Sequence, residues 1–130
     1  MEINTEENYI YESIHNLYEM ARIGWFDNFE VCIYGEERTI PHLHIKDKQT
    51  EKECCIKLDK PEYFFHGDRE YFKLNSKQKK EFIKWLNTYK KNKSKIDIGI
   101  TNWWSICDLW DINNPDNELK NWDMPNYNLL

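Results

Sequence analysis

Two histidines, His42 and His44, are the residues of this chain best suited to carry chemistry. They stand in the tetrapeptide Pro-His-Leu-His at positions 41–44. In an extended strand, side chains two positions apart project from the same face. Two imidazoles at that spacing can bind one metal ion. Residues 41–44 are therefore the first candidate for a functional site.

A metal centre on this pair would need more ligands. His66, in the aromatic segment that follows, is the third candidate. A fourth ligand could come from a nearby carboxylate, on Glu53, Asp59 or Asp68. An open coordination position would then carry an activated water. The alternative is that His42 and His44 are structural, with at least one of them hydrogen-bonded to backbone or to a carboxylate. We favour the structural alternative, and expect neither a metal nor another cofactor.

The four cysteines form no recognised metal or redox motif. The sequence has no Cys-x-x-Cys pair, which zinc knuckles and thioredoxin-like sites require. Cys54 and Cys55 are adjacent, so on a strand they would point to opposite faces. We expect four free, partly buried thiols in a reducing compartment, the cytoplasm.

Tryptophans and acidic residues near the C-terminus offer a second candidate surface. Trp103 and Trp110 fall at helical spacing and are predicted to be core, whereas Trp104 is predicted to be exposed. Asp108 and Asp111 begin an acidic run that continues into the C-terminal segment. These carboxylates could mimic phosphates toward a basic partner, or could form an ordinary solvated face.

The elements that must position these residues indicate an α+β fold. Strand-like segments with short connections predict a small antiparallel sheet of three to four strands, at residues 29–34, 41–47 and 53–58. Apolar residues at helical spacing predict one N-terminal helix and two C-terminal helices, at residues 6–22, 76–89 and 101–113. Gly24 is the predicted stop of the first helix, and Asn75 or Ser76 and Thr101 are the predicted caps of the others. Trp85, on the apolar stripe of the helix at 76–89, should be largely buried against the sheet.

The whole chain, residues 1–130, is expected to be one domain. It would comprise the N-terminal helix (1–24), a sheet region (29–75), the two helices (76–113) and a tail (114–130), with residues 90–95 as a solvated linker. The net charge of −5 weakens any proposal of a broad nucleic-acid face. The sequence shows no signal peptide and no apolar run of membrane-spanning length, so no membrane partner is expected.

Two motifs resemble a small bacterial family of unknown function. The strand Phe-Glu-Val-Cys-Ile-Tyr (29–34) and Pro-His-Leu-His (41–44) are similar to its Ile-x-Ile-x-Tyr strand and Pro-His-Phe-His motif. Residues 55–58, Gly67 and residues 84–86 follow in matching order, so the resemblance covers about residues 29–110. The chain departs from the family pattern in its N-terminal helix, in Leu43 where the family has Phe, and in its long tail. Members of that family often occur in toxin–antitoxin-like or mobile-element loci.

These features together predict a non-enzymatic interaction protein of a bacterial or phage mobile element. It would bind another protein, such as a nucleic-acid-binding effector, as a toxin–antitoxin component or as an inhibitor of a host defence system such as CRISPR. Its candidate binding residues are His42, His44, His66, Trp104, Asp108 and Asp111. The alternative function is a metal-dependent hydrolase or nuclease built on His42, His44 and His66. Stoichiometric metal would favour the enzyme, and a dry histidine cluster buried among rings would favour the binding protein.

Overall fold

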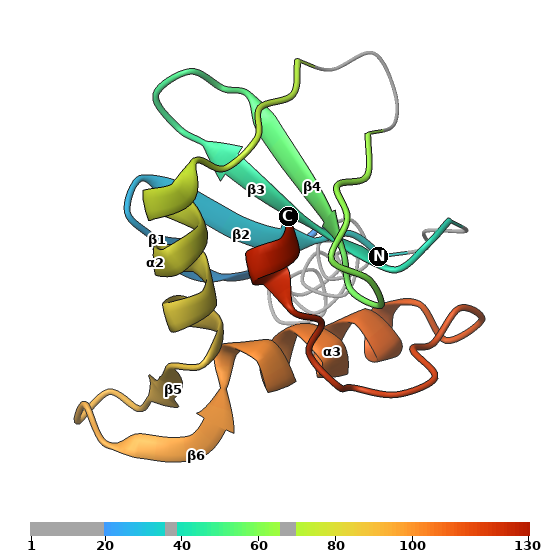
Figure 1. Ribbon diagram of the computed structural model, residues 1–130. Helices are drawn as coiled ribbons and strands as arrows, with labels where there is room; N and C mark the ends of the chain where they lie inside the picture. The colour runs from blue at the N-terminus through green and yellow to red at the C-terminus, as the bar shows by residue number, and fades with distance from the viewer. Residues whose placement is uncertain (1–19, 36–38, 66–69) are drawn as a thin grey trace, which may run out of the picture.

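A computed structural model describes residues 20–35, 39–65 and 70–130 of the chain. Four strands come first: β1 (Ala21–Phe26), β2 (Phe29–Ile33), β3 (His42–Asp47) and β4 (Glu53–Lys57). They are followed by α2 (Ser76–Leu86), β5 (Tyr89–Lys91), β6 (Asp97–Thr101), α3 (Asn102–Asn113) and the short 3₁₀ helix η1 (Tyr127–Leu129). The described part is α+β, as the sequence predicted (Figure 1).

The four N-terminal strands form one antiparallel meander in the order β1-β2-β3-β4. The polar loop between β3 and β4 turns through Glu51, whose positive φ of 60° lies in the left-handed region. Three of these strands agree with the sequence prediction to within one residue at each end. In its described residues, 58–65 and 70–75, the aromatic segment after β4 contributes two isolated bridges, from Tyr63 to Ile56 and from Tyr71 to Glu53.

One face of this sheet is apolar and carries the core. Alternate residues of β2, β3 and β4 point to that face: Val31, Ile33, Leu43, Ile45, Cys54 and Ile56. They pack in one cluster with Phe82 and Leu86 of α2 and with Ile106 and Trp110 of α3. Both helices therefore cover the sheet, as expected from their amphipathic spacing.

Both helices begin with a side-chain cap at the residues predicted from the sequence. Asn75 accepts from the Gln78 N–H, and the Gln78 side chain accepts from the Asn75 N–H, which makes a capping box. Thr101 accepts from the Trp104 N–H at 3.1 Å. The helix predicted to reach residue 89 ends at Leu86, because the chain turns there into β5.

The predicted N-terminal helix lies almost wholly outside the described residues, but its predicted end is wrong. Ala21 and Arg22 belong to β1, and Gly24 lies inside that strand at a shift in its register with β2. A Cβ atom on Gly24 would lie 3.1 Å from the Trp85 ring. The close approach of α2 to β1 therefore explains why residue 24 is a glycine, and the residue does not end a helix. Trp85 packs there and against Phe26, with a ring-centroid distance of 6.0 Å, and stays partly exposed.

The segment predicted as a solvated linker is the turn of a second hairpin. Strands β5 and β6 pair antiparallel and form their own two-stranded sheet between α2 and α3. We name residues 89–101 the hairpin arm. In Figure 1 the arm projects from the end of the molecule where α2 and α3 meet. Lys90 joins the start of the arm to β1, because its ammonium group donates to the Ile23 carbonyl at 2.9 Å.

The C-terminal segment, predicted as a tail, packs back onto the core. Tyr127 is buried and its hydroxyl donates to the Lys57 carbonyl at 2.5 Å. The ring lies against Phe82, with centroids 5.6 Å apart. None of the helices in the described part of the chain has the length and apolar character needed to cross a membrane.

Candidate functional site

The second face of the sheet is lined by ionisable side chains instead of apolar ones. Strand register places them in rows that run across β2, β3 and β4. One row is Glu30–Lys46–Glu53, and the next is Cys32–His44–Cys55. His42 begins the third row, opposite Lys57. The Pro-His-Leu-His motif thus lies at the centre of a polar sheet face, with both imidazoles on that face as predicted.

The two imidazoles are hydrogen-bonded to each other and to the backbone. His42 Nδ1 lies 2.7 Å from the Ile40 carbonyl oxygen, and His42 Nε2 lies 3.1 Å from His44 Nε2. A carbonyl oxygen can only accept, so His42 Nδ1 carries a hydrogen. The expectation that at least one of the pair bonds to backbone is confirmed.

Aromatic rings surround this pair on several sides. The rings of Phe64 and Trp110 lie 4.8 and 5.8 Å from that of His42, and the Tyr34 ring lies 4.7 Å from that of His44. His42 is 0% and His44 1% exposed. The imidazoles are therefore enclosed, and neither is presented to solvent.

His44 also meets a thiol and a carboxylate on β4. Its Nδ1 lies 3.3 Å from Cys55 Sγ and 3.6 Å from Glu53 Oε2. All three side chains are buried, and their donor atoms lie within 4.8 Å of one another. An imidazole, a thiol and a carboxylate at such separations can share protons or bind one metal ion. Sequence reasoning named Glu53 only as an optional ligand and did not include Cys55 in any site.

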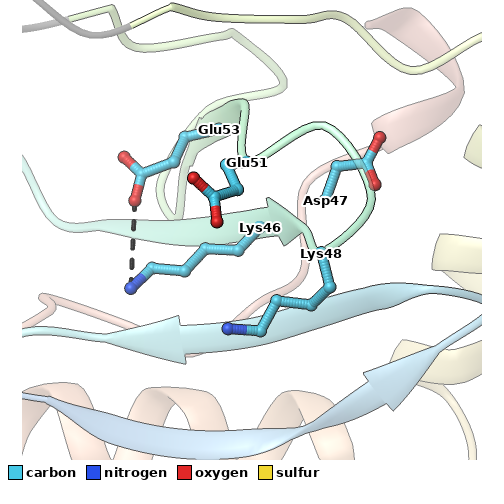
Figure 2. A pocket seen from close by; sticks show the side chains of 5 residues that line it. All are labelled: Lys46, Asp47, Lys48, Glu51 and Glu53. Atoms are coloured by element: carbon cyan, nitrogen blue, oxygen red, sulfur yellow. Dashed lines mark ion pairs between the residues drawn. The ribbon is translucent and has the colours of Figure 1, made fainter.

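Glu53 connects this buried cluster to a hollow at the surface. The hollow has a volume of about 430 Å³ and is lined by Lys46, Asp47, Lys48, Glu51 and Glu53. Figure 2 shows these side chains, with Lys46 Nζ paired to the Glu53 carboxylate at 3.9 Å. Charged groups of both signs line it, so it favours a small polar or ionic ligand over an apolar one.

The carboxylate of a neighbouring ion pair is more deeply buried, although its cationic partners Arg22 and Lys48 are about half exposed. The Glu30 carboxylate is 1% exposed, and the Arg22 guanidinium lies 2.6 Å from it. Lys48 Nζ approaches the other carboxylate oxygen at 3.9 Å. A buried carboxylate needs such partners, because an unpaired charge loses its hydration. This pair joins β1 to β2 on the polar face.

All four cysteines are buried thiols, and none of them forms a disulfide. Burial raises the pKa of the Cys32 thiol to about 11, and burial also raises the pKa of the Cys54 thiol. Cys54 lies in the apolar core and Cys55 on the polar face, as the alternation of a strand predicts. Cys32 and Cys54 therefore remain neutral thiols near neutral pH.

The other predicted site residues lie elsewhere. His66 lies outside the described residues, so the structure gives no position for a third imidazole. Trp104 is exposed on α3 and its ring meets Trp122 edge-on at 5.2 Å. Asp108 is partly exposed on the same helix. Asp111 accepts from the Leu119 N–H and from Trp122 Nε1, both at 2.8 Å. The structure brings His42 and His44 together, but not the C-terminal residues with them.

Comparisons of the chain with protein-family models, curated proteins and solved structures found no match.

Proposed function

We propose that this chain is a non-enzymatic interaction protein that acts by binding another protein, with the hairpin arm as its contact surface. The observation that carries the proposal is the apolar character of the arm. Tyr89, Ile96 and Ile98 are exposed there, and Ile96 is 62% exposed. Isolated apolar side chains on a surface are ordinary, but several on one projecting element are typical of a binding site.

The arm has the geometry of an interaction element. Its strands are short and belong to a sheet that, within the described residues, contains no third strand. A two-stranded hairpin is marginally stable in water, and its open edges can pair with a strand of another protein. Lys91, Lys93 and Lys95 are exposed around the isoleucines. The arm therefore fits a partner that offers an apolar groove with an acidic rim.

The enclosure of the histidine pair also supports binding over hydrolysis. A hydrolytic substrate must reach the reacting groups, and the His42 and His44 rings are enclosed by Tyr34, Phe64 and Trp110. The resemblance described above supports a role in a mobile element, as a toxin–antitoxin component or an inhibitor of a defence system.

The experiment is affinity capture from the native host with two surface variants. Ile96→Asp combined with Ile98→Asp places charge on the arm, and Leu129→Asp places charge on a residue that is 69% exposed in η1. Exposed substitutions of this kind change stability by about 0.5 kcal/mol or less. We expect the arm variant to lose the captured partner and Leu129→Asp to keep it. Equal capture by all three proteins would contradict the proposal.

A further inference from the structure

Three donor atoms on β3 and β4, from His44, Glu53 and Cys55, lie within 4.8 Å of one another. Tetrahedral zinc has bonds of about 2.0–2.3 Å, which places neighbouring ligand atoms roughly 3.3–3.6 Å apart. His44 Nδ1 lies 3.3 Å from Cys55 Sγ and 3.6 Å from Glu53 Oε2. We propose that His44, Glu53 and Cys55 form a zinc site that pins β3 to β4. This site departs from the expectation of no metal and goes beyond the protein-binding function. Because its ligands are buried and join two strands, stoichiometric zinc bound there would not by itself favour the enzyme.

The hydrogen-bond chain through His42 orients the proposed imidazole ligand. His42 Nδ1 donates to the Ile40 carbonyl, so in a neutral ring His42 Nε2 is an acceptor. The 3.1 Å contact then requires His44 Nε2 to donate. A neutral His44 is left with its lone pair on Nδ1, on the side of Cys55 and Glu53. Metal-binding histidines commonly donate their other ring nitrogen in this way, which fixes the tautomer.

The donor set selects the class of metal. A thiolate and an imidazole favour zinc and similar borderline or soft ions, whereas Mg²⁺ and Ca²⁺ require oxygen ligands. The Glu53 carboxylate also lines the surface hollow, and its side chain is the most exposed of the three, at 11%. The hollow therefore gives ions and water a route to the site. A fourth ligand from solvent would complete the coordination.

This site differs from the metal site suggested by the sequence, which combined His42 and His44 with a third imidazole from His66. The described residues supply two of those three imidazoles, His42 and His44. In the site proposed here His42 is a positioning residue, and the thiolate of Cys55 is a ligand. The two arrangements can be separated, because only one of them joins sulfur to the metal.

The test starts from metal-free protein prepared with a chelator and reducing agent. Zn²⁺ binding is measured by calorimetry and elemental analysis, and Co²⁺ is added separately as a spectroscopic probe. We expect one zinc per chain and a near-ultraviolet thiolate-to-cobalt charge-transfer band. Wild-type protein that binds no stoichiometric metal would overturn the proposal. So would bound cobalt without a thiolate band, which would exclude Cys55 as a ligand.

The cysteine pair supplies a matched control. Cys55→Ala and Cys54→Ala each remove one buried thiol from neighbouring positions, but Cys54 faces the apolar core. We expect Cys55→Ala to lose the band and Cys54→Ala to keep it. His42→Phe keeps a ring but removes the acceptor, and should weaken zinc binding about 10–100-fold. Glu53→Gln, at the edge of the hollow, should weaken it as well. If a variant does not fold, the cobalt spectrum of the wild-type protein still shows whether a thiolate binds the metal. Equal spectra from the two folded cysteine variants would overturn the proposal.

Discussion

Asp111 offers the sharpest test of how the C-terminal segment is held. Its carboxylate accepts from the Leu119 N–H and from Trp122 Nε1, both at 2.8 Å. A hydrogen bond to a charged group contributes about 1.5–3 kcal/mol. Asp111 is only partly buried, so water can replace some of the lost interaction. We expect Asp111→Ala to reduce the free energy of unfolding by about 3 kcal/mol.

Two further variants show whether this loss comes from the two hydrogen bonds. Asp111→Asn keeps one acceptor oxygen but turns the other into a donor that faces a donor, so about half of the loss is expected. Asp108→Ala removes a carboxylate from the same helix, and should cost about 0.5 kcal/mol or less. The assay is equilibrium unfolding in urea, followed by tryptophan fluorescence. Equal stability of Asp111→Ala and Asp108→Ala would refute the reasoning, and would return Asp111 to the solvated acidic face that the sequence allowed.

Three other predictions concern packing, capping and pH. Trp85→Ala should reduce the free energy of unfolding by about 2 kcal/mol. This is below the 3–5 kcal/mol typical of a fully buried tryptophan, because the ring is partly exposed. A loss under about 0.5 kcal/mol in urea unfolding would mean that its contacts with Phe26 and Gly24 contribute nothing. Thr101→Ala should cost about 1 kcal/mol through loss of the cap of α3, whereas Ser105→Ala, inside that helix, should cost less; the two variants are compared by thermal unfolding. Burial raises the pKa of the Cys107 thiol to about 12, so the unfolded state loses this proton first and the free energy of unfolding should fall as pH rises above about 8.5. Cys107→Ala should reduce that fall by up to about 1.4 kcal/mol per pH unit, and an unchanged slope would contradict the assignment.

The elements that sequence reasoning found are those with a strong local signal. Strands β2, β3 and β4 alternate or run apolar between turn residues, and α2 and α3 carry both an apolar stripe and a capping side chain. Strand β1 was missed because the apolar spacing before it continues through Ala21 in helical register. Its pairing with β2 is a tertiary preference that overrides local periodicity.

The hairpin arm had a signal that was not used. Ile96, Ile98 and Ile100 alternate, which is the period of a strand. The lysines before them indicate a solvated linker instead, because a charged run usually lies in a solvated loop. Only the pairing of β5 with β6 shows that these lysines flank the turn of a hairpin.

The candidate site was predictable only in part. Spacing alone places His42 and His44 on one face of a strand. It does not give the register between β3 and β4, which brings Cys55 opposite His44. That register depends on how the loop between the strands closes, and a shift of one residue would bring Cys54 there instead. All three proposed ligands are therefore visible in the sequence, but the strand register that brings them together is not.

The most direct test of the central claim is site-specific cross-linking from the hairpin arm. A photo-reactive amino acid replaces Ile98 in one protein and Lys80, which is exposed on α2, in another. Both proteins are mixed with the partner captured from the native host and irradiated. We predict a covalent adduct with that partner from position 98 and none from position 80. An adduct from position 80 alone would contradict the assignment of the arm as the binding surface.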